Sequence, residues 1–253
     1  MSVTIAVAET PLVRFLLGRA DDALILGHRL SEWTGRAPIL EEELALANMA
    51  LDLIGQARAL YSMAAEAEGG GHDEDAYAYL RDDAQFRNLL IVEQPRGDFA
   101  DTMVRQALYA IYAKLFWQAA SRSTHPPLAG FAAKTAKEMA YHVRHASTWV
   151  IRLGDGTEAS RARAQVALER LAPYVEEMFE PEDDSLTGIV PAVPELREDW
   201  EREVRSLLGE ARLNLPDVVF SQRGGRAGRH GEALGHLLAV FQHLHRSHPG
   251  ATW

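Results

Sequence analysis

The sequence predicts an all-α protein, and three observations support this prediction. Apolar residues recur with the period of a helix over most of the 253 residues. Alanine, the best helix former, is frequent throughout the chain. Glycine and proline gather in a few short stretches, such as residues 69–71 and 126–127, which separate long helical segments. The run at residues 218–220 is the one strand-like piece, and it is short.

Four long helices are expected at residues 11–33, 39–67, 98–123 and 128–153. The first begins at Pro11, because the first turn of a helix tolerates proline. The second opens on three consecutive glutamates, which the positive end of the helix dipole favours. A tight turn joins the first two helices and another joins the last two, so each pair is expected to form an antiparallel hairpin.

Shorter helices are predicted around these hairpins. Two of them, at residues 73–80 and 82–92, lie in the long crossover that joins the hairpins. Three more, at residues 157–179, 195–213 and 232–247, follow the second hairpin. Two hairpins joined by one long crossover form the ferritin-like four-helix bundle. We therefore expect a single ferritin-like domain over residues 1–253, with its core bundle at about 11–153 and a helical C-terminal extension at about 157–253.

Composition excludes several classes of protein. There are 36 acidic and 26 basic residues, a net charge of −10, which disfavours a nucleic-acid binder. The chain has no cysteine, which excludes disulfides, iron–sulfur ligation and thiol catalysis. No stretch has the length of a membrane helix, and the first residues do not have the pattern of a signal peptide. We expect a cytoplasmic protein that binds neither nucleic acid nor membrane.

The ferritin-like prediction can be tested against the ligands of a di-iron site. Such a site takes one Glu from each of two helices and a Glu-x-x-His motif from each of the other two. In the helix at 128–153, Glu138, His142 and His145 share the apolar face. Their spacing is Glu-x-x-x-His, with Tyr141 at the third position, so the motif is not intact. The alternative to a metal site is a buried hydrogen-bonded network.

The other helices supply too few ligands. Asp52 is the best acid in the second helix, but Gly55 stands where the motif requires His. Hairpin symmetry places Asp22 opposite Asp52, and no carboxylate lies opposite Glu138. We therefore predict a vestigial site that binds no metal, formed by Asp22, Asp52, Glu138 and His142.

Two further expectations concern the polar groups of this vestigial site. Buried carboxylates are costly without a counter-charge, so cations such as Arg29, His142 or His145 are expected beside them. Asn48, Asp52 and Gln56 form a polar line along the second helix. Solvated faces usually carry Lys and Glu instead, so this line is predicted to be buried.

A Gly/Arg segment precedes the last helix. Its arginines, Arg223, Arg226 and Arg229, are candidates for contact with a phosphate, such as that of a nucleotide-derived thioester. The segment is not a P-loop, and the alternative is an ordered loop packed on a partner or on the chain's own acidic groups. The sequence contains no dinucleotide fingerprint and no nucleophile motif, and we identify no catalytic residue.

Four stretches of the sequence resemble one known family, the C subunits of bacterial phenylacetyl-CoA epoxidase. They are residues 44–58 (LALANMALDLIGQAR), 81–101 (RDDAQFRNLLIVEQPRGDFAD), 136–157 (AKEMAYHVRHASTWVIRLGDGT) and 225–253. The two middle stretches are the most specific. Together with the spacing between them, the four extend over nearly the whole chain.

The resemblance implies a partner role in an oxygen-dependent epoxidation of the aromatic ring of phenylacetyl-CoA. In this family, the catalytic A subunit holds the di-iron centre and binds the CoA thioester. The C subunit has a similar ferritin-like fold, lacks the iron ligands and acts as a structural partner of the catalytic one. The B subunit, together with a reductase that uses NADPH, completes the system. The resemblance thus implies no cofactor and no catalytic residue in this chain, and a homodimer is a further expectation for the isolated chain.

Two alternatives remain open at this point. The first is a free-standing ferritin-like metal-dependent oxygenase that uses Glu138, His142 and Asp52. The second is a helical protein that binds acyl-CoA in an internal polar pocket. Iron and turnover in the isolated chain would indicate the first, and acyl-CoA binding without a partner would indicate the second.

Overall fold

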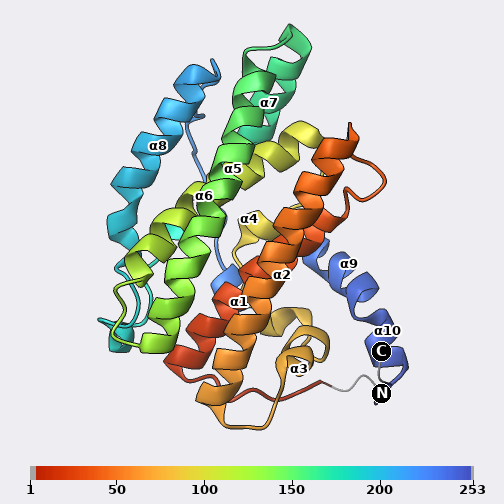
Figure 1. Cartoon of the computed structure of the whole chain (residues 1–253), viewed down its shortest axis with the longest axis vertical. Helices are drawn as coiled ribbons and strands as arrows, with labels where there is room; N and C mark the ends of the chain where they lie inside the picture. Colours follow the sequence, from red (N-terminus) through yellow and green to blue (C-terminus); the bar gives the residue numbers. More distant parts are fainter. Residues whose placement is uncertain (1–3, 252–253) are drawn as a thin grey trace. The chain divides into compact units, whose positions relative to one another are not determined.

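The structure is a computed structural model that describes residues 4–251 (Figure 1). The helices are α1 (Pro11–Ser31), α2 (Leu40–Glu68), α3 (Glu74–Tyr79), α4 (Leu90–Glu93), α5 (Phe99–Ala120), α6 (Pro126–Gly154), α7 (Glu158–Leu171), α8 (Arg197–Glu210), α9 (Glu232–Phe241) and α10 (His243–Ser247). Within the described residues, the β pairing is limited to an isolated bridge between Thr187 and Val190. The all-α prediction is therefore confirmed, and no strand forms at residues 218–220.

The four long helices lie within three residues of their predicted bounds, whereas several shorter ones differ. The helix expected at 82–92 is a 3₁₀ turn at Asp83–Gln85 followed by the single turn of α4. Between them, the N–H groups of Arg87 and Leu89 donate to side chains of α1 instead of closing helical turns. The helix expected at 157–179 ends at Leu171 and continues as 3₁₀ turns, because Pro173 has no N–H to donate.

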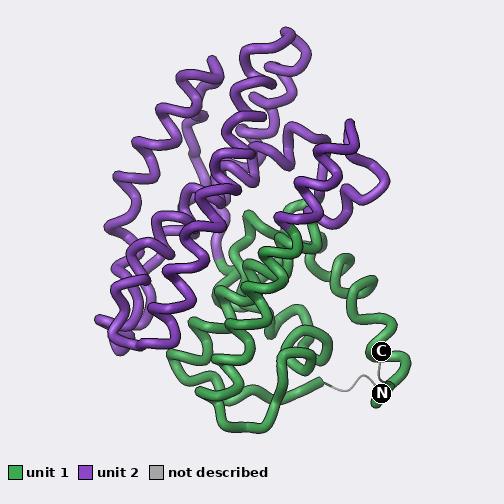
Figure 2. The backbone as a smooth tube through the Cα atoms, viewed as in Figure 1, with its two compact units in different colours: residues 1–29, 50–95, 224–253 green, residues 30–49, 96–223 purple. Residues whose placement is uncertain are grey.

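The chain divides into two compact units, each built from separate stretches of sequence (Figure 2). Among the described residues, unit 1 comprises 4–29, 50–95 and 224–251, and unit 2 comprises 30–49 and 96–223. The single ferritin-like domain stays a prediction. In the described part of the chain, no helix has the length and apolar character that a membrane span needs.

In unit 1, the parts of α1 and α2 that it contains run antiparallel. Tyr61, late in α2, donates a hydrogen bond of 2.6 Å to Asp21 in the middle of α1. Gly27, late in α1, approaches the earlier part of α2, where a Cβ on this glycine would lie 3.3 Å from the carbonyl oxygen of Ala50. The absence of a side chain at Gly27 thus allows the two helices to pack closely, as the predicted hairpin requires.

In unit 2, α5 is the central helix and packs against α6, α7 and α8. Three side-chain pairs show that α5 and α6 run antiparallel, as predicted: Phe99 with Trp149, Gln106 with His142, and Trp117 with Phe131. Burial extends around most of α5, which explains why its sequence is apolar on almost every side. From α8, the buried Trp200 donates from Nε1 to the carbonyl oxygen of Leu108, 3.0 Å away.

Gly154, the last residue of α6, lies close to the backbone of Ala211. A Cβ at this position would lie 1.9 Å from the carbonyl oxygen of Ala211. We expect Gly154→Ala to lower the free energy of unfolding by about 1–3 kcal/mol, because the backbones must move apart. Urea unfolding measures the effect. Gly130→Ala, in the same helix with nothing within 4 Å of its Cβ, is the matched control and should raise stability. Equal effects of the two variants would contradict the packing argument.

Candidate functional site

The polar interior of unit 1 is organised by two adjacent aspartates of α1. Asp21 and Asp22 are both fully buried, which confirms the inward orientation predicted for Asp22. A buried carboxylate is stable only when cations and hydrogen-bond donors surround it. The partners of these two side chains therefore show what the polar interior does.

Asp21 is held by Arg81, which follows α3 and is itself fully buried. The guanidinium binds both carboxylate oxygens, with Nη1 3.1 Å from Oδ2, and also contacts the phenol of Tyr61 at 3.1 Å. Its Nε and Nη1 donate to the carbonyl oxygens of Tyr77 and Gln85. Burial raises the pKa of Tyr61 well above its ordinary value, so the phenol stays protonated and donates to Asp21. This cluster binds the crossover to the first hairpin.

Asp22 is held by Arg226 of the Gly/Arg segment. Arg226 Nη2 lies 2.6 Å from Asp22 Oδ2, and Nη1 also donates to the carbonyl oxygens of Gly18 and Arg87. The guanidinium occupies the space above Gly18, where a Cβ would come within 2.8 Å of Nη1. The N–H of Leu89 donates to Asp22 Oδ1 at 2.7 Å. A carboxylate predicted to belong to a vestigial metal site thus binds the C-terminal segment and the crossover.

Glu93 forms a third buried cluster. Its carboxylate accepts hydrogen bonds from Asn88 and from the N–H of Gly231, and it pairs with His230 Nδ1 at 2.8 Å. The other ring nitrogen of His230 lies 3.0 Å from the carbonyl oxygen of Phe86. Both nitrogens face acceptors, so the doubly protonated imidazolium fits this position.

The His230–Glu93 pair makes stability depend on pH. Burial lowers the pKa of His230, but the hydrogen bonds to Glu93 and Phe86 outweigh it, so the net pKa is raised. Because the pKa of His230 is higher in the folded protein, the stabilisation by this pair is fully present below the unfolded-state pKa of about 6.5. It is lost as the pH rises through the folded-state pKa. We expect His230→Gln to lower the free energy of unfolding by about 1–3 kcal/mol at pH 6 and by less at pH 9. Urea unfolding at the two pH values measures the difference.

The control for this pH dependence is His236→Gln. His236 forms a similar pair with Glu232 at 3.0 Å, but its side chain is 76% exposed. This variant should change stability little at either pH. A pH-independent penalty for His230→Gln would contradict the assigned charge of His230.

The predicted residues of α6 have different surroundings from one another. His142 is fully buried and lies 3.1 Å from the side-chain amide of Gln106. Glu138 is 20% exposed and pairs with Lys134 at 3.3 Å. His145 Nε2 lies 2.8 Å from Glu42, an acid in the first turn of α2. Within unit 2, each of these three side chains thus has a hydrogen-bond or ion-pair partner.

The polar line expected along α2 is only partly buried. Gln56 is buried, Asp52 is half-buried and Asn48 is exposed, so the prediction was wrong for Asn48. Asn48 lies on a face of α2 that also presents the exposed Leu44 and Leu51, 57% and 65% exposed. The absence of Lys and Glu from this face therefore does not reflect burial within the chain.

The three candidate phosphate ligands each contact other groups of the chain. Arg223, in unit 2, pairs with Glu176 at 3.6 Å and Glu180 at 3.4 Å. Arg226 is bound to Asp22, and the side chain of Arg229 folds over Gly224. This arrangement favours the alternative, a loop packed on the chain's own acidic groups. Within residues 4–251, no group of three or more His, Asp or Glu side chains is arranged to hold a metal ion.

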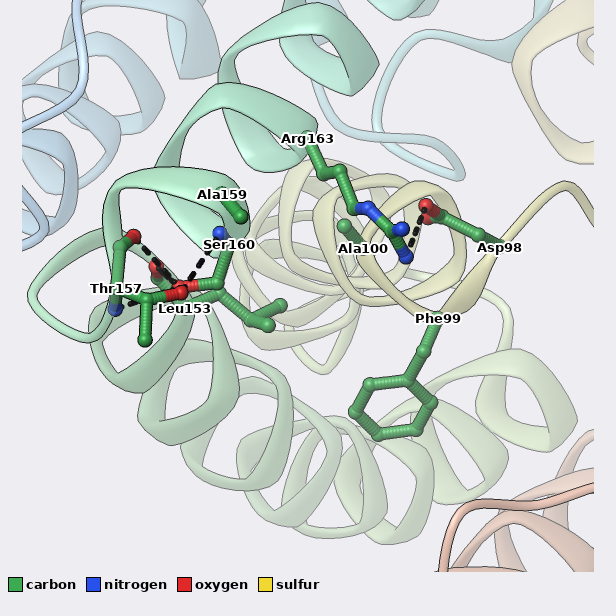
Figure 3. A pocket seen from close by; sticks show the side chains of 8 residues that line it. All are labelled: Asp98, Phe99, Ala100, Leu153, Thr157, Ala159, Ser160 and Arg163. Atoms are coloured by element: carbon green, nitrogen blue, oxygen red, sulfur yellow. Dashed lines mark hydrogen bonds and ion pairs between the residues drawn. The ribbon is translucent and has the colours of Figure 1, made fainter.

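Figure 3 shows a surface hollow of about 270 Å³ where α5 begins, α6 ends and α7 begins. The polar side chains that line it have partners within the wall. Arg163 reaches Asp98 at 3.8 Å, and Thr157 caps α7 by accepting from the N–H of Ser160. These contacts stabilise helix ends, and the lining offers no arrangement typical of catalysis.

Sequence reasoning missed most partners of the buried acids. Arg81 and Glu93 were not singled out, and Glu42 was interpreted only through the helix dipole. A usable signal was present for the first two, because both lie in the stretch 81–101 that carries the family resemblance. A second signal was the Asp21-Asp22 pair within an apolar helix, which indicates buried acids that need cations from elsewhere in the chain.

Two comparisons with known proteins agree with the resemblance. A family described as phenylacetic acid catabolic protein matches residues 2–253. The chain belongs to this family. It is 43% identical over 246 residues to the C subunit of the 1,2-phenylacetyl-CoA epoxidase of Escherichia coli (strain K12), an alignment that covers 96% of this chain and 99% of that protein. The similarity to a C subunit of phenylacetyl-CoA epoxidase, predicted from four stretches of sequence, is confirmed.

Proposed function

We propose that this chain is a structural, non-catalytic subunit of a multicomponent phenylacetyl-CoA epoxidase. The relative from Escherichia coli is named as the C subunit of that enzyme, and the match extends over nearly the full length of both chains. Other subunits are therefore its partners. Following the family resemblance, these partners are the di-iron catalytic A subunit, the B subunit and a reductase. The complex is expected in the cytoplasm. The two antiparallel hairpins support a ferritin-like arrangement like that expected of the catalytic subunit.

One observation carries the proposal: interior acids of the chain are bound by the chain's own cations. Arg81 binds Asp21, Arg226 binds Asp22, His230 binds Glu93 and His145 binds Glu42. Carboxylates neutralised in this way hold helices and loops together, and a positive metal ion would have to displace those cations. Asp22, Asp52, Glu138 and His142 are therefore best explained as structural residues.

A structural partner of this kind contributes to the reaction by packing. Catalytic groups on a helical bundle keep their geometry only when the supporting helices are held in place. A rigid partner fixes those helices and helps to exclude water from the acyl-CoA channel. Interfaces of permanent complexes are large and apolar, and exposed leucines such as Leu44 and Leu51 of α2 suit one.

Co-expression with the catalytic subunit tests this proposal. A tagged form of this chain should retain the catalytic subunit through purification, and iron should be found only in preparations that contain the catalytic subunit. The chain purified alone should neither hold iron nor turn over phenylacetyl-CoA. About two irons per isolated chain with turnover would indicate a free-standing oxygenase. Tight binding of acyl-CoA by the isolated chain would indicate a ligand-binding protein. Either result would overturn the proposal.

A further inference from the structure

One face of α6 carries the same aromatic–arginine pair twice. The guanidinium of Arg144 lies over the ring of Tyr141, 5.3 Å from its centroid. Eight residues later, Arg152 lies over the ring of Trp149 at 5.2 Å. We call these four residues the α6 stripe. They belong to the stretch 136–157 that carries the family resemblance. The ring of Trp149 also packs edge-on against Phe99 of α5, which holds this part of the stripe in place.

The stacking holds each guanidinium group over its own ring, so the two groups stay apart. Each arginine folds back over the ring three residues before it, so both side chains point in the same direction along the helix. A separation of eight residues corresponds to about 12 Å along a helix axis. The rings also restrict the rotamers of the arginines, which lowers the entropy lost when a partner binds.

Both arginines are exposed. In the part of the chain that the structure describes, neither Arg144 nor Arg152 forms an ion pair with an acid. Tyr141 is also exposed, by 39%. Arginine, tyrosine and tryptophan are the residues most enriched among those that dominate binding energy at protein interfaces.

A hollow of about 260 Å³ lies along the stripe. Besides the four stripe residues, it is lined by Glu42, His145 and Thr148. The Glu42–His145 pair, with its side chains only 11% and 12% exposed, forms a fixed contact between α2 and α6 beside the stripe. The stripe is therefore built on a rigid support within unit 2.

We propose that the α6 stripe docks a helix of the catalytic subunit that carries two acidic side chains about two turns apart. The proposal rests on the proposed function, which supplies the partner. Two guanidinium groups separated by about 12 Å along the helix axis do not converge on one small anion, whereas acids at positions i and i+7 or i+8 of a helix have a similar axial separation. Each planar guanidinium still has N–H groups for a bidentate bond to a carboxylate.

The test is co-purification of the tagged chain with the catalytic subunit. Arg144→Glu with Arg152→Glu should weaken retention at least about tenfold, because two attractive contacts become repulsive. Arg122→Glu with Arg202→Glu makes the same charge change at two exposed arginines outside the stripe, and should retain the partner like the wild type. Arg144→Lys with Arg152→Lys keeps the charge but loses the planar guanidinium that stacks on each ring. Its retention of the catalytic subunit should lie between that of the wild type and that of the Glu variant.

The outcomes separate this inference from the proposed function. Unchanged retention by the Glu variant, with the unfolding midpoint of the wild type, would overturn the docking site and leave the proposed function intact. Failure of the wild-type chain to retain the catalytic subunit would overturn the proposed function itself. Binding of free coenzyme A to the wild-type chain that is lost in the Glu variant, with assembly unchanged, would assign the stripe to a small anion and also overturn the proposal.

Discussion

Replacing Arg81 with methionine is expected to lower the free energy of unfolding by about 3–5 kcal/mol, one of the two largest single effects in the chain. The guanidinium is fully buried and neutralises Asp21. Methionine fills similar space but leaves a buried carboxylate without its cation. Urea unfolding of the purified chain, followed by far-UV circular dichroism, measures the loss.

The double variant Asp21→Asn with Arg81→Met is the control. It removes both charges, so the uncompensated carboxylate disappears and part of the lost stability should return. The stability that the double variant does not regain measures the loss of hydrogen bonds, such as those that Arg81 donates to Tyr77 and Gln85. If the double variant is as unstable as the sum of the two single variants, charge pairing does not explain the cluster.

Asp22→Asn is expected to have an effect of similar size, about 3 kcal/mol or more. Asparagine preserves the shape of the side chain but removes the negative charge that pairs with Arg226 and with the buried Arg19. The C-terminal segment and the crossover both depend on this side chain, so the whole of unit 1 should become less stable. Thermal or urea unfolding, compared with that of the wild type, detects the change.

Asp22→Asn also separates a structural role from a metal role. If Asp22 only holds Arg226, the stability loss should be the same with added iron and with a chelator. If Asp22 were a metal ligand, the wild type would gain stability from iron and the variant would not. Asp52→Asn is the matched control, because Asp52 is half-buried in α2 of the same unit. Asp52→Asn should lower the free energy of unfolding far less than Asp22→Asn does.

The long helices were predictable because local signals define them. Apolar periodicity, glycine and proline breaks, and the acids at the start of α2 placed α1, α2, α5 and α6 to within a few residues. The crossover was less predictable, since its backbone is directed by side chains distant in sequence. The N–H groups of Arg87 and Leu89 bind Asp21 and Asp22, and no pattern within residues 82–92 indicates this.

The candidate site was predictable in its acids but not in their partners. Asp22 and His142 stand out because polar side chains on apolar helical faces are rare, and both are fully buried. Arg226 was one candidate for phosphate contact, because a Gly/Arg segment before a helix is typical of anion binding, and packing of the loop on acidic groups was the alternative. Its actual partner, Asp22, lies 204 residues away in sequence, a contact that spacing cannot reveal.

The most direct test of the structural role is turnover of the assembled epoxidase containing the double variant Asp52→Asn with Glu138→Gln. Both side chains are only half-buried, so the variant should fold and assemble. The two changes remove the acids that a metal site in this chain would need while preserving their shapes. A structural role predicts that kcat for phenylacetyl-CoA and the iron content of the complex equal those of the wild type. A kcat reduced by about 100-fold or more in a fully assembled complex would contradict it and place chemistry in this chain.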